Sequence, residues 1–286
     1  MFSQAIVATD LGPASEGIVA CAGALRSLGI TEAVLVHAID LGREPTPDQD
    51  AVFRHQADSL EAAGVRVHVE TPLGYAPHAI ANLAQEHGAG IIVMGTRGQG
   101  LFHTGFSGSI SSDVVRLSSV PVLLVPSNAT PTASSGGQAC SRLLASVLIP
   151  MDLTECAERV CELACGLSQT GTDRFEFLTV VDMSFEAVRE GREARAKELL
   201  EQMATRARAA GVADVHTTLV RGKPDEEVAR FAASGRYTLV VLAPNCHDTI
   251  DQAFGSVTSS VIRASSSPVL LAPPQCETGF YGRGNT

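Results

Sequence analysis

The segment GSISSDVVRLSSVPVLLVP at residues 108–126 returns as GSVTSSVIRASSSPVLLAP at residues 255–273. Self-similarity of this kind decides the architecture, because each copy must form the same structural unit. Three further blocks repeat in the same order, namely 3–25 with 145–167, 33–40 with 175–182, and 69–95 with 217–243. The chain is a tandem duplication.

Short apolar segments alternate with amphipathic segments inside each half. In the first half we expect strands near residues 4–9, 33–39, 65–71, 89–94 and 121–125, and helices near 13–28, 47–63, 76–87 and 108–117. The strands are continuous apolar runs, which is typical of a parallel sheet covered on both faces. The sequence therefore predicts an α/β fold with two doubly wound parallel five-stranded sheets, one in each half, with right-handed crossovers.

A polar stretch separates the two halves. Residues 128–141 are rich in Ser, Thr, Gly and Pro and have no apolar periodicity, so we interpret them as a flexible linker. We expect one domain at 1–127, a second at 142–276, and a loose tail at 277–286.

The composition of the chain argues against some classes of partner. The 286-residue chain has a formal net charge of −10 and two lysines, Lys197 and Lys223. Binding to nucleic acid needs clustered Lys and Arg, so we expect no nucleic-acid partner. The first residues lack the basic and apolar segments of a signal peptide, and no apolar run approaches the length of a membrane span. We expect a cytoplasmic protein with no membrane partner.

The seven cysteines include no CxxC pair. Cys161 and Cys165 lie four residues apart in a helical pattern and can touch. Small buried hydrophobic residues in a reducing compartment are the simplest interpretation, with a redox or metal role as the alternative.

The loop after the fourth expected strand carries the candidate chemistry. It reads Gly95-Thr-Arg-Gly98, followed by nine residues and then Gly108-Ser109 at the start of a helix. Glycines let backbone amides approach phosphate oxygens, and a helix N-terminus adds unpaired amides and a positive dipole end. A Walker-type loop is excluded because the first half contains no lysine, and the turn DLGPAS after the first strand is not the dinucleotide motif GxGxxG.

Simpler interpretations stand beside this one. Asp10 either binds a ligand or caps the first helix through Ser15. Gly95 and Gly98 either contact phosphate or serve only as turn residues. His37, in an apolar strand, is expected to be a core histidine with a satisfied partner, and His103 either reaches a phosphate or faces water.

The GxxG motif, the nine-residue gap and the following G[ST] resemble the ATP-binding signature of the universal stress protein family. The Asp at the end of the first strand, the VHAID segment and the PVLLVP strand extend the resemblance, which covers both halves as in tandem members of that family. The resemblance implies a strand order of 3-2-1-4-5 and a bound ATP accompanied by Mg²⁺ or Mn²⁺. It also implies that the domains pair through their last strands, here PVLLVP and PVLLAP, and that two chains can associate further as a dimer.

The resemblance also assigns roles to individual residues. Asp10, with Ala8 and Thr9, is expected near adenine and ribose, and Ala38 against the base. Met94 and Gly95 would line the floor of the site. The phosphates would be held by Arg97, Gly98, Gly108, Ser109 and Ile110. Family members often have His at the position of Arg97, and a guanidinium can serve the same phosphate by a bidentate contact.

The second half departs from the signature. Ala243 stands where the first half has Gly95, and Pro244 lacks an amide donor. Asp248 and Asp251 place negative charge where phosphates would lie. We expect weak or no ATP binding in this half, which would then be structural or face a partner.

These features favour an ATP-binding stress-response or signalling module in which the nucleotide is a bound regulator. No motif positions a catalytic base, and no G-x-S-x-G elbow is present, so we expect no enzyme activity beyond slow ATP hydrolysis. The alternatives are a slow ATPase or phosphotransferase, and an interaction scaffold that binds no nucleotide. AMP or a cyclic nucleotide remains open as the adenine ligand.

Overall fold

A computed structural model describes eight segments of the chain, residues 1–20, 22–39, 46–96, 110–126, 142–154, 156–182, 189–244 and 254–273. Strands and helices alternate in both halves. The first half contains β1 (Gln4–Ala8), α1 (Pro13–Ala20), α2 (Ala22–Ser27), β2 (Glu32–Val36), α3 (Pro47–Ala62), β3 (Arg66–Glu70), α4 (Ala76–Glu86), β4 (Ile91–Gly95), α5 (Ile110–Leu117) and β5 (Val122–Val125).

The second half repeats this pattern. Its elements are β6 (Ser146–Met151), α7 (Cys156–Ser168), β7 (Arg174–Val181), α8 (Arg189–Ala209), β8 (Asp214–Arg221), α9 (Pro224–Ala232), β9 (Leu239–Leu242), α10 (Ser256–Ala264) and β10 (Val269–Leu271). The strands are close to their expected positions, and α1 and α2 both lie within the helix expected over 13–28, on either side of residue 21, which is outside the described residues.

The strand order within each half is the expected 3-2-1-4-5. It is β3-β2-β1-β4-β5 in the first half and β8-β7-β6-β9-β10 in the second, and all neighbours within a half are parallel. In both halves, therefore, the chain first moves outward from its first strand, then returns and continues on the other side.

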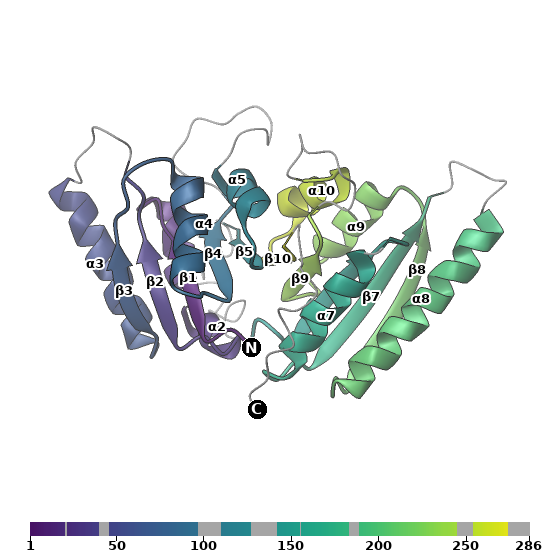
Figure 1. The fold of residues 1–286 in the computed structure, drawn as a ribbon. Helices are drawn as coiled ribbons and strands as arrows, with labels where there is room; N and C mark the ends of the chain where they lie inside the picture. The colour runs from purple at the N-terminus through teal and green to yellow at the C-terminus, as the bar shows by residue number, and fades with distance from the viewer. Residues whose placement is uncertain are drawn as a thin grey trace.

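The two halves share one ten-stranded sheet, which corrects the expectation of two separate five-stranded sheets. β5 and β10 pair in the antiparallel sense, with Leu123 opposite Leu270, and join the halves at the centre of the molecule (Figure 1). The physical reason is that both strands are apolar, with Leu123 2% and Leu270 0% exposed, and an open apolar edge would leave backbone groups unpaired. The predicted contact between the last strands is confirmed, and this contact merges the sheets.

Successive side chains along each strand point to opposite faces of the sheet, so the core consists of two clusters, one on each face. In β1, Ala5 and Val7 belong to the cluster that packs against α1, α2, α3, α7 and α8. Ile6 and Ala8 belong to the cluster that packs against α4, α5, α9 and α10. Each cluster includes residues of both halves, so the two halves share a core on either face of the sheet.

The cysteines differ from one another in state. The sulfur atoms of Cys161 and Cys165 are 3.7 Å apart on α7, so the predicted contact is confirmed. Cys156, at the start of the same helix, is disulfide-bonded. Cys156 is buried, as expected, but its disulfide bond was not expected for a reducing compartment.

Across the described segments, none of the helices has both the length and the apolar character needed to cross a membrane.

Candidate functional site

In the first half, β2 and β3 lie on one side of β1, and β4 and β5 lie on the other. The order in which strands are added therefore reverses between β1 and β4. Ala8, the last residue of β1, is the register partner of Val36 in β2 and of Met94 in β4. The carboxyl ends of these three strands therefore lie side by side. In open α/β sheets, ligands bind outside the carboxyl ends of the strands at such a switch point.

Seven of the predicted site residues lie in described segments, and six of them gather at this edge. The six are Ala8, Thr9, Asp10, Ala38, Met94 and Gly95, which end or directly follow β1, β2 and β4. The seventh, Ile110, is the first residue of α5 and is exposed. Arg97, Gly98, Gly108 and Ser109, as well as His103, lie outside the described residues.

The Asp10 side chain organises the turn that leads into α1. Its Oδ1 atom accepts hydrogen bonds from the Gly12 amide at 3.0 Å and from the Ser15 hydroxyl. The Ser15 oxygen in turn accepts a hydrogen bond from the Asp10 amide at 3.2 Å. The helix-capping role considered for Asp10 is therefore present.

The same turn contains a strained residue. Leu11 has φ 58°, and in the described part of the chain it is the only residue other than glycine with a positive φ. Its amide donates to Thr9 Oγ1 at 3.0 Å, and its side chain packs against the core. Such a conformation costs about 1–3 kcal/mol, and residues held in it cluster at functional sites.

His37 has the satisfied polar partner that was expected, but it is half-buried and directly follows β2 rather than lying in the core. Its Nδ1 atom lies 3.0 Å from the carbonyl oxygen of Thr9, and its ring packs near Phe53 with centroids 6.2 Å apart. The Thr9 amide donates to the Val36 carbonyl at 2.9 Å. These contacts hold the segment after β1 against β2.

One contact near this edge was not predicted from the sequence. Tyr75, just before α4, is 57% exposed and donates a hydrogen bond from its hydroxyl to Asp113 on α5. Asp113 is also paired with Arg116 at 3.0 Å. The hydrogen bond to Asp113 raises the pKa of Tyr75 above its usual value. The contact ties the start of α4 to the first turn of α5.

The turn after β6 differs from its counterpart in the first half. Asp152, which matches Asp10, accepts from the Thr154 amide at 3.1 Å and from the Thr154 hydroxyl at 2.5 Å. The hydroxyl oxygen of Thr154 accepts from the Cys156 amide at 3.2 Å. A threonine thus links the aspartate to the helix, and Leu153 does not have the positive φ of Leu11.

The start of α10 is tied to the end of β9. The Gly255 amide donates to the Pro244 carbonyl at 2.9 Å, and the Thr258 hydroxyl donates to the Ala243 carbonyl at 3.1 Å. Phe254, just before this helix, is 7% exposed and packs into the core. Side-chain and main-chain groups of the protein therefore occupy positions next to this helix N-terminus.

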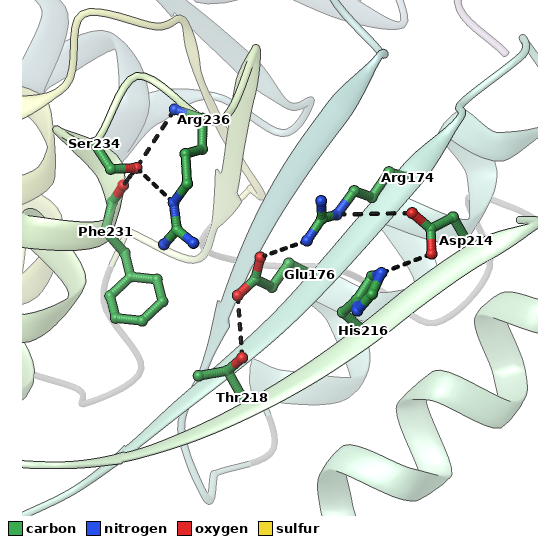
Figure 2. Close-up of polar contacts among 8 residues, drawn as sticks. All are labelled: Arg174, Glu176, Asp214, His216, Thr218, Phe231, Ser234 and Arg236. Atoms are coloured by element: carbon green, nitrogen blue, oxygen red, sulfur yellow. Dashed lines mark hydrogen bonds and ion pairs between the residues drawn. The ribbon is translucent and has the colours of Figure 1, made fainter.

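A polar network lies in the amino-terminal parts of β7 and β8, toward the ends opposite the carboxyl ends of the strands. Figure 2 shows its contacts. The buried carboxylate of Glu176 is bonded to Arg174 at 3.3 Å and to the Thr218 hydroxyl at 3.1 Å. Asp214 pairs with His216 at 2.7 Å and lies 3.9 Å from Arg174. Because burial of a carboxylate is unfavourable without such partners, the network explains how Glu176 is accommodated within the sheet.

Several solved structures share this fold. A universal stress protein from Archaeoglobus fulgidus DSM 4304 superposes with a TM-score of 0.70 and 21% identity, over 94% of this chain and 95% of that chain. A functionally unknown protein from Pseudomonas aeruginosa PAO1 superposes with a TM-score of 0.62 and 16% identity, over 96% and 93%. A universal stress protein in complex with cAMP matches 46% of this chain and 98% of that chain, at 20% identity and a TM-score of 0.37.

No curated protein shows significant sequence similarity to the chain. A family model described as the universal stress protein family matches residues 1–126 and 145–273, which together make up most of the chain. The two matched segments correspond to the two halves of the ten-stranded sheet. The chain therefore belongs to the universal stress protein family and contains two copies of its domain.

Proposed function

We propose that the chain is an ATP-binding stress-response or signalling module, with the nucleotide held at the switch point of the first half as a bound regulator. The observation that carries the proposal is the convergence of six expected contact residues at the carboxyl ends of β1, β2 and β4. These residues lie in three separate parts of the sequence, and the topology brings them to one edge.

The residue types at this edge suit a nucleoside. Ala8, Ala38 and Gly95 have small side chains or none, so a flat base can approach the backbone closely. Thr9 and Asp10 provide hydroxyl and carboxylate oxygens, the groups that hydrogen-bond to ribose hydroxyls. These residue types therefore fit a flat base and a ribose.

The strained turn supports the same site. Leu11 stores backbone strain directly beside Asp10, and the Thr9 and Asp10 side chains hold the turn by hydrogen bonds to main-chain amides. Strain that the surrounding contacts maintain is frequent where a protein prearranges groups for a ligand. In the proposal, this turn presents Asp10 to the ribose.

The phosphates are assigned to the start of α5 and the loop before it. A helix N-terminus offers unpaired amides and a positive dipole end to an anion. Arg97, Gly98, Gly108 and Ser109, which lie outside the described residues, would complete this grip together with Ile110. Mg²⁺ or Mn²⁺ would accompany the nucleotide and neutralise part of the phosphate charge.

The second half is proposed to be a structural or partner-facing copy. The start of α10 is tied to β9 through Gly255 and Thr258, and Phe254 is packed beside it. A triphosphate would have to displace these contacts. Asp248 and Asp251, which lie outside the described residues, add negative charge to the loop before this helix in the sequence, where the signature would need phosphate donors. The contrast between the halves therefore predicts one nucleotide for each chain.

Nucleotide binding should stabilise the protein against unfolding. Mg-ATP at a hundredfold excess over its Kd should raise the free energy of unfolding by about 2.7 kcal/mol. Asp10→Ala should weaken ATP binding about tenfold or more, because hydrogen bonds to charged groups contribute about 1.5–3 kcal/mol. Thermal unfolding with and without Mg-ATP, together with calorimetric titration, measures both effects.

Ser15→Ala is the matched control for the capping role of Asp10. It removes the hydroxyl that bonds to Asp10 and should cost about 1 kcal/mol of stability, while leaving the carboxylate in place for the ligand. ATP affinity should therefore be close to that of the unmodified protein. Equal loss of ATP affinity in both variants would mean that Asp10 acts only as a helix cap.

The two repeats offer a second matched pair of variants. Calorimetric titration should give one ATP for each chain, and Asp152→Ala in the second half should leave both the affinity and the stoichiometry unchanged. A stoichiometry of two, or a loss of affinity in Asp152→Ala equal to that in Asp10→Ala, would contradict the assignment of the site to the first half.

A further inference from the structure

Two thiols meet on one face of α7. Cys161 and Cys165 are separated by four residues, which places their side chains one above the other on a helix. Their sulfur atoms are 3.7 Å apart, and neither takes part in a disulfide. The nearby Cys156 is disulfide-bonded and does not compete as a thiol.

The two sulfur atoms are close enough for a single atom to bind both. They are 3.7 Å apart and in direct contact. A pyramidal trivalent centre holds two thiolate sulfurs slightly closer together than this, so small rotations of the Cys161 and Cys165 side chains would bring both thiols onto one atom without movement of the helix.

The two thiols differ in exposure and in charge. Cys161 is 1% exposed, whereas Cys165 is only half-buried and offers a route of entry from solvent. The hydrogen bond from Cys161 lowers the pKa of Cys165, and the positive charge of Arg206 on α8 acts in the same direction. Cys165 is therefore the thiol that solvent reaches and that reacts first, and Cys161 is the second, buried ligand.

The number of ligands indicates which chemistry fits. In the described segments, no group of three or more His, Cys, Asp or Glu residues could hold a metal ion. A structural zinc site has four protein ligands, but a trivalent arsenical retains its own substituent and needs only two thiols. Soft thiolate ligands favour such a thiophilic centre.

We propose that Cys161 and Cys165 form a bidentate binding site for trivalent arsenicals. For an arsenical with one arsenic–oxygen group, two arsenic–sulfur bonds form and the bonds from arsenic to oxygen break. The two thiol protons leave with that oxygen as one molecule of water. Arsenic remains trivalent, so the step requires no oxidant or reductant.

Phenylarsine oxide is the probe that tests this site. Incubation of the full-length protein, followed by intact mass spectrometry, should show one phenylarsine group bound to Cys161 and Cys165 with the loss of one water. This adduct should resist washing with the monothiol 2-mercaptoethanol and should be released by the dithiol 2,3-dimercaptopropanol, because only a dithiol replaces both bonds at once.

Single substitutions identify the two ligands. Cys165→Ser and Cys161→Ala should each abolish the monothiol-resistant adduct, while Cys246→Ser, a control at another cysteine, should retain it. Because Cys165 is half-buried, Cys165→Ser should keep the fold, and a thermal unfolding curve will check this. If Cys161→Ala proves unstable, the result for Cys165→Ser alone tests the proposal. A monothiol-resistant adduct in Cys165→Ser, or its loss in Cys246→Ser, would overturn the proposal.

Discussion

Leu270→Asp should unfold the protein or destabilise it by more than about 4 kcal/mol, the range seen when a charge is buried without a partner. Leu270 is fully buried at the centre of β10, opposite Leu123 of β5, where the two halves join. A carboxylate at this position would lose its hydration within an apolar core and gain no counterion. Urea unfolding followed by circular dichroism will measure the loss.

Leu270→Ile is the matched control at the same position. It conserves volume and apolar character, so it should cost less than about 1.5 kcal/mol. If Leu270→Asp were as stable as Leu270→Ile, the β5–β10 pairing could not be an important source of stability, and the halves would have to be treated as independent domains.

Phe177→Ala should lower the free energy of unfolding by about 3–5 kcal/mol, the usual cost of deleting a buried phenylalanine side chain. Phe177 is fully buried on β7, and its ring meets that of Phe175 edge to face, with centroids 6.0 Å apart and planes at 83°. The substitution therefore removes both buried apolar surface and an aromatic contact. Chemical denaturation will give the change in stability.

The same variant tests whether the halves unfold together. Because the sheet is continuous, amide hydrogens of β1 and β4 in the first half should exchange faster in Phe177→Ala, in proportion to the loss of global stability. Phe177→Leu should show a smaller effect in the same direction. Unchanged exchange in β1 and β4 would show that the second half unfolds on its own.

Much of the fold could be predicted because apolar runs and turn residues in the sequence indicate the local secondary structure. The helix expected at 76–87 is α4 at Ala76–Glu86, and the strand expected at 121–125 is β5 at Val122–Val125. The number of sheets could not be obtained in this way. A strand such as VLLV is equally apolar whether its neighbour comes from its own half or from the other, and only the β5–β10 register shows that the sheets are joined.

The candidate site was predictable where topology determines it. Ala8 and Met94 are register partners near the ends of neighbouring parallel strands, so the strand order brings them to one edge. The left-handed conformation of Leu11 was not predictable, because the adjacent Gly12 is the residue type that tolerates such a conformation. The contact between Tyr75 and Asp113 spans 38 residues, and no local pattern in the sequence indicates it.

Joining β5 to β10 within one polypeptide also changes how the two copies can evolve. In a dimer of identical subunits, every substitution alters both partners at once. Here each copy accumulates changes separately, while the covalent link keeps their association independent of protein concentration. One copy can therefore diverge at its turn, as the contrast between Asp10 with Ser15 and Asp152 with Thr154 illustrates, provided that it preserves the strand that completes its neighbour's sheet.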